Sequence, residues 1–407
     1  MTSHSPTPDP APGPAHDPAS AGGTETDLRD GVITRDAVGR ALLGWAGVGA
    51  LALAAPLLAT TLPSLALALV LTGIIALIVI AASGVVRQAE ALAHRLGDPY
   101  GTLVLTLSIV VIEVVLIAAV MLGPGAHATI ARDSVMAVSM IILNLVLGLC
   151  LLVGGLRHGP LAVHRVGTSA YLVMLVALAA LAVAVPSTLG HDGVYSPVQA
   201  VVIGVLTAAL YAVFLWRQTG AQAGDFQEAR PPAPAGRAAA QEAEAPRPPL
   251  REILAAHRPE LLARAGLLIA TVLPIVLLSH DMAPLLDDGL SRLGAPTALG
   301  GVLIAMIVFT PESLTAVRAA RAGEMQRVVN LCHGALVSTL ALTIPTVLMI
   351  GLLTGNEVVL AESPTNLLLL AVTLAVAAIS AAAPRVTALH GAVHLLLFGV
   401  YALALFS

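Results

Sequence analysis

Charged residues are scarce in this chain. Asp, Glu, Lys and Arg together make up 11% of its 407 residues, whereas hydrophobic residues make up 57%. A soluble domain of this size carries charge on about a quarter of its residues. The composition therefore excludes an ordinary soluble protein and places most of the chain in lipid.

Cysteine is nearly absent. Cys150 and Cys332 both fall in apolar runs, without the spacing of a disulfide framework or a zinc site, so we expect them to be packing residues. Residues 1–40 show no apolar periodicity and cannot offset their ordering entropy, which predicts a disordered cytoplasmic tail. This tail has no short apolar segment with a cleavage site, and we expect the first apolar run to be an uncleaved anchor.

Long apolar runs recur along the chain. A helix needs about 20 mainly apolar residues to cross about 30 Å of hydrocarbon, and eleven runs approach or exceed that length. The sequence therefore predicts an all-α integral membrane protein with about eleven transmembrane helices. The runs are Leu42–Leu62, Leu65–Val86, Tyr100–Leu122, Ser134–Leu156, Thr168–Val185, Val198–Trp216, Leu261–Leu278, Thr297–Ala319, Val328–Leu353, Thr365–Ala382 and Val386–Phe406.

The placement of arginine predicts the orientation. All 20 basic residues are Arg, and 18 of them fall on one side if the N-terminal tail is cytoplasmic. Only Arg132 and Arg292 then lie outside, as the excess of positive charge in cytoplasmic loops requires. We expect a multi-pass protein of the inner (plasma) membrane, with its N-terminus cytoplasmic and its C-terminus outside.

Two segments resemble each other. Residues 101–105 lead to Glu113, and residues 300–304 lead to Glu312. In the predicted topology the two glutamate helices run in opposite directions, which is typical of the inverted repeats of secondary transporters. The predicted organisation is a tail (1–40), a first transmembrane helix (41–63), a five-helix repeat (64–216), a flexible cytoplasmic linker rich in Pro, Ala and Glu (217–260) and a second five-helix repeat (261–407).

Glu113 and Glu312 are the carboxylates that fall deep within apolar runs. A charge at the bilayer centre costs at least about 2.5 kcal/mol, so such residues usually mark an ion pathway. The alternative is a protonated glutamate that only bonds a neighbouring helix. Pro311 precedes Glu312 and removes a helical N–H, which either frees the carbonyl of Ile307 for an ion or merely kinks the helix.

Other polar residues follow on the next helix of each half. Asn144, Ser338 and Thr339 could join the two glutamates as metal ligands, because Ca²⁺ takes 6–8 oxygen ligands. The alternative for each is a local hydrogen bond. His333 could relay protons together with Glu113 and Glu312, or simply pack. Ser139 is a further hydroxyl, and His390 and His394 lack the intervening Glu of an HExxH motif, so we interpret that pair as structural.

Charge balance indicates the mechanism. Two ionised carboxylates with one divalent cation are neutral, and so are two protonated carboxylates, whereas the empty ionised site is costly in a low-dielectric interior. A site of this kind favours antiport by alternating access. The alternatives are an Na⁺(K⁺)/H⁺ antiporter with the same site, an intramembrane enzyme, for which a metal cluster or DDxxD motif is missing, and a passive cation channel.

Several motifs resemble a known family. Residues 97–108 (GDPYGTLVLTLS) with Glu113, residues 310–314 (TPESL) and residues 354–357 (TGNE) resemble the bacterial ChaA-type calcium/proton antiporters of the calcium:cation antiporter superfamily. The resemblance covers Leu42–Phe406 and implies ten repeat helices around a midplane site plus one additional N-terminal helix. Val110 and Phe309 stand where many calcium/proton exchangers carry Asn, and the ChaA-type group is also associated with Na⁺ and K⁺ exchange.

The expected partners follow from these observations. They are inorganic cations, most readily Ca²⁺ with Na⁺ or K⁺ as the alternative, together with protons and the lipid bilayer. We expect no nucleic acid, no cofactor and no catalytic residue, since the predicted activity is transport and not an enzymatic reaction.

Overall fold

The computed structural model describes residues 34–58, 62–96, 110, 114, 117–118, 121, 128–220, 223–226, 258–296 and 298–406. All secondary-structure elements in these ranges are helices, and β-pairing there is limited to isolated bridges. Eight of the described helices, some with a π-helical segment, are long and apolar enough to cross a membrane. The prediction of an all-α membrane protein is confirmed for the described part of the chain.

The helices correspond to the predicted runs, except that Tyr100–Leu122 lies almost wholly outside the described residues. The number eleven therefore stays a prediction. The elements are α2 (Arg35–Leu58), α3 (Ser64–Leu96), α5 (Ile130–Met140), the π-helical η1 (Ile141–Val146), α6 (Leu147–His158), α7 (Arg165–Ala179), the π-helical η2 (Ala180–Ala184), α8 (Pro186–Leu189), α9 (Pro197–Thr219), the 3₁₀ turn η3 (Ala223–Phe226), α11 (Arg258–Arg292), α12 (Ala298–Ala322), α13 (Met325–Thr354), α14 (Pro364–Ala382) and α15 (Ala388–Ala404).

Local sequence signals set several helix ends. Ser196 begins α9 with a capping box, in which its side chain accepts from the N–H of Gln199 while the Gln199 side chain accepts from the N–H of Ser196. Ser363 is the N-cap of α14, where its side chain accepts from the N–H of Asn366 and a proline follows it. Gly355 ends α13 with φ 72°, a left-handed conformation that glycine adopts without strain.

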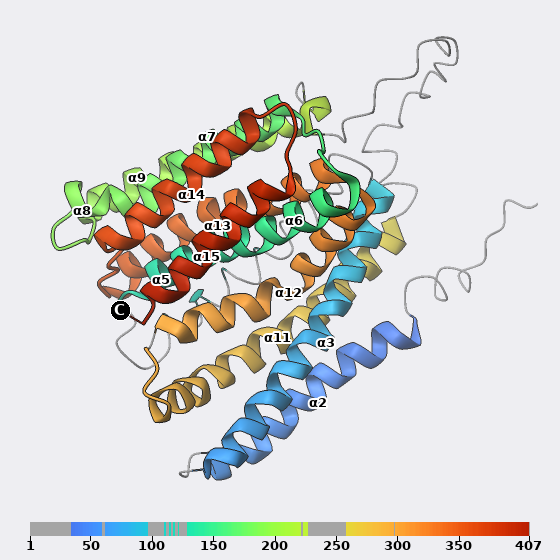
Figure 1. The fold of residues 1–407 in the computed structure, drawn as a ribbon. Coiled ribbons are helices and arrows are strands. Elements are labelled where there is room, and N and C mark those ends of the chain that lie inside the picture. Colours follow the sequence, from blue (N-terminus) through green and yellow to red (C-terminus); the bar gives the residue numbers. More distant parts are fainter. Residues whose placement is uncertain are drawn as a thin grey trace, which may run out of the picture.

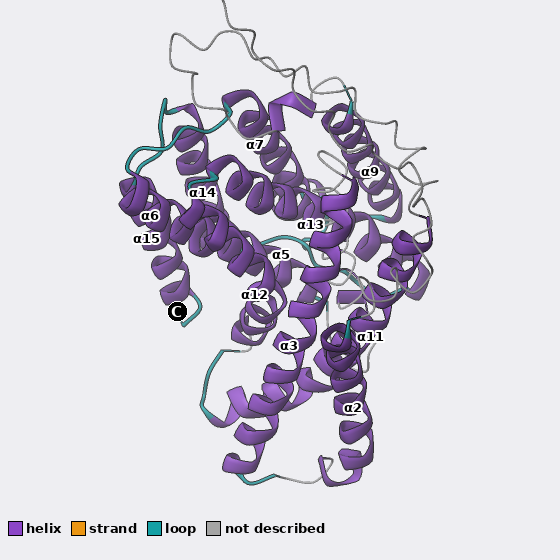
Figure 2. Ribbon diagram, turned by 90° about the vertical axis from the view of Figure 1, so that its right-hand side faces the viewer, coloured by secondary structure: helices purple, strands orange, loops and turns teal. Residues whose placement is uncertain are grey.

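The helices form two packed groups. Figure 1 shows α2, α3 and α11 together below the remaining helices, and their apolar side chains form a cluster that includes Ile78, Leu278 and Met282. The other group, with α13 near its middle, is seen from a second side in Figure 2. Helix α12 contacts α3 and α11 of the first group and α5, α6 and α13 of the second. Helix α12 therefore contacts both groups.

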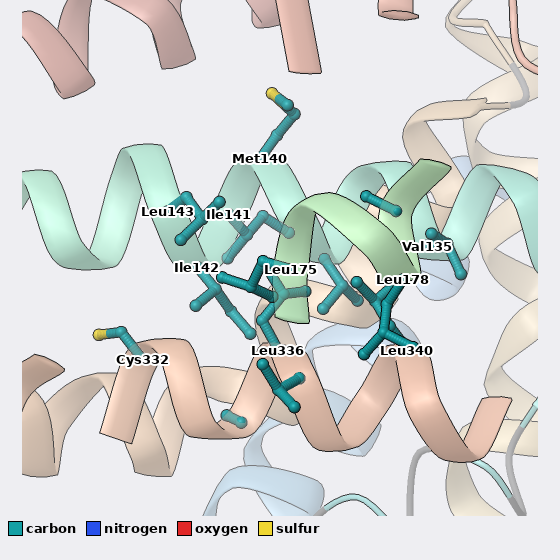
Figure 3. Packing of buried hydrophobic residues seen from close by; sticks show 14 of the residues in the cluster. Val135, Met140, Ile141, Ile142, Leu143, Leu175, Leu178, Cys332, Leu336 and Leu340 are labelled. Carbon is teal, nitrogen blue, oxygen red and sulfur yellow. The ribbon is translucent and has the colours of Figure 1, made fainter. Parts of the chain in front are cut away.

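The larger core lies between α5, η1, α7 and α13. Figure 3 shows Ile142, Leu175 and Leu336 meeting there from three different helices, all of them buried. The outward faces are also apolar, since Leu53 of α2 is 85% exposed and Trp216 of α9 is 72% exposed. Large apolar side chains on the outside are unfavourable in water and fit a surface that faces lipid.

Glycines allow α6 and α15 to pack closely. A Cβ added to Gly391 would lie 2.5 Å from the carbonyl oxygen of Gly148, and one added to Gly155 would meet the backbone of Ala388. Small residues at such crossings let helix backbones approach within membranes. This contact joins a helix from each half of the chain and fixes their separation.

Two segments are longer or more ordered than the sequence indicates. Helix α11 continues to Arg292, well past the predicted end at Leu278, with the polar side chains of His280 and Asp281 about half exposed on its outer part. The predicted linker begins with ordered residues, because Phe226 of η3 is buried against the rings of Tyr171 and Phe214.

Candidate functional site

Glu312 lies at a recess where α12, α13 and the π-helical η1 meet. Glu312 is partly buried beside this recess. Most of the lining is apolar, and the polar side chains that face it come from Glu312, Ser313 and Cys332. The lining residues are Ile142, Val146, Phe309, Glu312, Ser313, Ala316, Leu331, Cys332 and Ala335.

The hydroxyl groups around Glu312 bond to their own helix. Ser313 Oγ donates to the carbonyl oxygen of Phe309 at 2.7 Å, and Thr310 Oγ1 donates to that of Met306 at 2.7 Å. The donor capacity of each hydroxyl is thus used, while its oxygen can still accept or coordinate. Helix α12 continues through Pro311 without a break.

Glu113 lies outside the described residues. Its described neighbours Val110, Val114, Ile117 and Met121 are helical, and Val110, Ile117 and Met121 are buried. Their spacing places them along one face of a helix. Whether Glu113 meets Glu312 stays a prediction.

The side chain of Asn144 forms hydrogen bonds on the side of η1 that faces away from the recess. Its Nδ2 donates to Thr373 Oγ1 of α14 at 2.8 Å, and its Oδ1 lies 3.1 Å from His394 Nδ1 of α15. Ile142 and Val146, two residues before and after it, line the recess instead. The structure thus places Asn144 on the segment that borders the recess, but with its side chain bonded to Thr373 and His394.

The candidates on α13 have separate environments. Ser338 Oγ lies 2.7 Å from the hydroxyl of Tyr211 on α9, and His333 Nδ1 lies 3.1 Å from the carbonyl oxygen of Val329. Thr339 is fully buried and lies seven residues after Cys332, which places both on one face of the helix. None of Ser338, Thr339 and His333 lines the recess among the described residues.

Cys332 is a site residue that the sequence analysis did not identify. It was expected only to pack, yet it lines the recess together with Glu312. Figure 3 shows its side chain on α13 near Ile142. Within the described ranges, no three His, Cys, Asp or Glu side chains gather in the geometry of a resident metal site. A lone cysteine in an apolar run carries no signal that distinguishes lining from packing.

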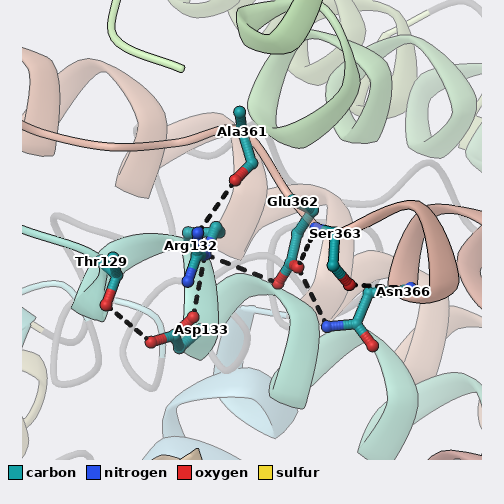
Figure 4. Close-up of polar contacts among 7 residues, drawn as sticks. All are labelled: Thr129, Arg132, Asp133, Ala361, Glu362, Ser363 and Asn366. Atoms are coloured by element: carbon teal, nitrogen blue, oxygen red, sulfur yellow. Dashed lines mark hydrogen bonds and ion pairs between the residues drawn. The ribbon is translucent and has the colours of Figure 1, made fainter. Parts of the chain in front are cut away.

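A polar cluster at one end of the bundle joins the two halves of the chain. Arg132 Nε lies 3.0 Å from Asp133 Oδ1 and 3.9 Å from Glu362 Oε1, and its Nη1 donates to the carbonyl oxygen of Ala361 (Figure 4). Glu362 is buried, and its Oε2 accepts from the N–H of Ser363 and from Asn366. The N–H of Glu362 donates to the carbonyl oxygen of Val183. Val183 lies in the π-helical η2, where the wider turn changes which N–H groups the carbonyl oxygens accept from.

The comparison with protein families gives a direct match. Residues 66–220 and 264–407 match the family described as "Sodium/calcium exchanger protein". The chain belongs to this family. The match covers both predicted repeats and omits the predicted tail and most of the linker. It confirms the membership of the calcium:cation antiporter superfamily that the paired glutamate motifs indicated, and the chain is a multi-pass membrane transporter.

Two curated relatives resemble this family member over most of its length. The chain is 37% identical over 325 residues to the "Putative ionic transporter y4hA" of Sinorhizobium fredii. The matched region covers 78% of this chain and 83% of the relative. The chain is 33% identical over 326 residues to the "Sodium-potassium/proton antiporter ChaA" of Escherichia coli, covering 80% and 86%.

Solved structures show the same fold. Native YfkE superposes with a TM-score of 0.64 at 15% identity, covering 90% of this chain and 98% of YfkE. The H⁺/Ca²⁺ exchanger CAX gives a TM-score of 0.59 at 14% identity, covering 91% and 89%. The arrangement of helices is therefore that of YfkE and CAX.

Proposed function

We propose that this exchanger moves a cytoplasmic cation, with Ca²⁺ as the leading ion, out across the plasma membrane in exchange for protons. Glu113 and Glu312 are the proposed groups that bind cation and proton in turn. The observation that carries the proposal is the position of Glu312, a carboxylate at a mostly apolar recess on a helix that contacts both packed groups.

The surroundings of Glu312 support an exchange mechanism. The recess offers few other charged groups, so an ionised carboxylate there is costly unless a cation or a proton neutralises it. Two such carboxylates balance one Ca²⁺ or two protons. Thr339 and Cys332 on one face of α13, and His333 beside them, are further proposed contributors to the cation and proton pathway.

The packing supports two inverted five-helix repeats. The proposed first helices of the two repeats, α3 and α11, pack against each other. The third member of each repeat packs against the fifth member of the other, because α6 contacts α15 and α13 contacts α9. Such reciprocal contacts are what a two-fold relation between the repeats requires, and alternating access can arise from movement of one group of helices against the other.

A second candidate is the exchange of Na⁺ or K⁺ for protons. The relative from Escherichia coli is named for sodium and potassium. The described lining of the recess also contributes few oxygens, and Ca²⁺ takes 6–8 oxygen ligands. The same two glutamates would serve this exchange.

Transport in proteoliposomes tests the proposal. A proton gradient is imposed, and its dissipation is followed after the addition of Ca²⁺, Na⁺ or K⁺ for the wild type, Glu113→Gln and Glu312→Gln. Glu357→Gln is the matched control, because Glu357 is exposed in the loop before α14. We expect dissipation with Ca²⁺ in the wild type and control, and its loss in both midplane variants.

The outcomes separate the candidates. Dissipation with Na⁺ or K⁺ but not with Ca²⁺ would replace the leading ion with the second candidate. Wild-type dissipation by both Gln variants for every ion would remove the two glutamates from the mechanism.

A further inference from the structure

A buried polar bridge connects η1 to the last two helices. Asn144, Thr373 and His394 are each fully buried, and they come from η1, α14 and α15. The Nδ2 of Asn144 also lies 3.3 Å from the sulfur of Met140, one turn earlier. Figure 3 shows Met140 pointing away from α13, opposite to the side toward which Ile142 points. The bridge and the recess thus lie on opposite faces of the same short segment.

The hydrogen bonds of the bridge define the state of His394. Oδ1 of Asn144 can only accept, so Nδ1 of His394 must carry the proton and donate to it. The Nε2 of His394 has no hydrogen-bond partner among the described residues. His390, one turn earlier, is instead part of the N-terminal cap of α15 with Thr387.

The segment that the bridge holds is a π-helical turn. Such a turn contains one residue more than an α-helical turn, and it persists where its surroundings favour it. Relaxation to an α-helix would rotate the residues on one side of the turn by about 100° relative to the other side. Ile142 and Val146 belong to this turn and line the recess beside Glu312. The register of η1 therefore decides which side chains face the recess.

We propose that Thr373 and His394 are positioning residues of the ion site. They hold the amide of Asn144 and thereby keep η1 in the register that presents Ile142 and Val146 to Glu312. The inference rests on the proposed function, because it takes the recess at Glu312 as the ion site. It assigns a role in cation binding to α14 and α15, neither of which contributes a lining residue.

Steady-state transport by single variants tests the inference. Thr373→Val and His394→Leu each remove one hydrogen bond to Asn144, whereas Thr373→Ser and His394→Asn retain a hydroxyl or a donor near Nδ1. Thr207→Val is the matched control, since Thr207 is equally buried and its hydroxyl has no partner among the described residues. The measurements are the KM and maximal rate for the cation that the wild type transports, with thermal unfolding in detergent.

Thr373→Val and His394→Leu should raise the cation KM about tenfold, which corresponds to about 1.4 kcal/mol. Thr373→Ser, His394→Asn and Thr207→Val should keep a KM within about twofold of the wild type. If Thr373→Val does not fold, Thr373→Ala and His394→Leu carry the same test.

Other outcomes would overturn the assignment. A wild-type KM in both bridge variants would do so, and so would an equal rise in Thr207→Val. Glu312→Gln is measured in parallel: if it has lost transport while the bridge variants behave as wild type, only the bridge inference fails. If Glu312→Gln transports normally, the proposed function fails first.

Discussion

Replacing Gly391 with Ala should push α15 away from α6. The added Cβ would lie 2.5 Å from the carbonyl oxygen of Gly148 and 2.9 Å from Cα of Leu152. Ordinary van der Waals contact begins near 3.4 Å, so the two helices must separate by roughly 1 Å. Both obstructing atoms belong to the backbone and cannot rotate away, which makes the substitution an overpacking change.

The expected magnitude is the difference of two effects. Overpacking typically costs about 1–3 kcal/mol, and replacing Gly by Ala within a helix gains up to about 1 kcal/mol. With the full gain, Gly391→Ala should lower the free energy of unfolding by up to about 2 kcal/mol. Gly399→Ala is the matched control on the same helix, because a Cβ there meets no atom of the described residues within 4 Å. It should be neutral or stabilising.

Thermal unfolding of the purified protein in detergent measures both variants. We expect Gly391→Ala to unfold at a lower temperature than the wild type and Gly399→Ala at the same or a higher temperature. Equal unfolding temperatures for the two variants would show that the close α6–α15 packing is wrong. The cation KM of Gly391→Ala should also rise, because the same displacement moves His394 away from Asn144.

Two further predictions concern the ends of the bundle. Arg132→Gln should lower the free energy of unfolding by about 1–3 kcal/mol, because it removes the cation beside the buried Glu362. Arg327→Gln is the control at an exposed ion pair and should change the free energy of unfolding by less than about 1 kcal/mol. Chemical denaturation in detergent compares the two variants. Burial raises the pKa of Tyr195, in the loop before α9, from 10.0 to about 12, and its hydroxyl donates to the carbonyl of Leu181. The buried, neutral side chain of Tyr195 contributes fully to stability below pH 10, and this contribution is lost as the pH rises toward about 12. The unfolding temperature of Tyr195→Phe should therefore depend less on pH in that interval than the unfolding temperature of the wild type.

Much of the fold could be predicted from the sequence. Apolar runs of sufficient length predicted the helices that the structure describes, since length and hydropathy alone govern whether a helix can cross a membrane. The C-terminal end of α11 could not be predicted from the sequence. His280, Asp281 and Pro284 interrupt the apolar pattern, yet the helix continues because its backbone bonds are satisfied internally whatever the side chains.

The candidate site was predictable only in part. Glu312 stood out because a carboxylate in an apolar run is costly, and it does lie at a recess. The partners of Asn144 could not be predicted, because Thr373 and His394 follow it by 229 and 250 residues and nothing local indicates the pairing. The π-helical form of η1 is likewise invisible in a continuous apolar run, although it decides which residues face the recess.

Proton release on cation binding tests the central claim most directly. The purified protein in weakly buffered detergent solution is mixed with Ca²⁺, Na⁺ or K⁺, and the pH change and the bound cation are measured together for the wild type and Glu312→Gln. If the same carboxylates hold either cation or protons, cation binding must release protons, and Glu312→Gln must lose both signals. Cation binding without proton release in the wild type, or unchanged release in Glu312→Gln, would contradict the account.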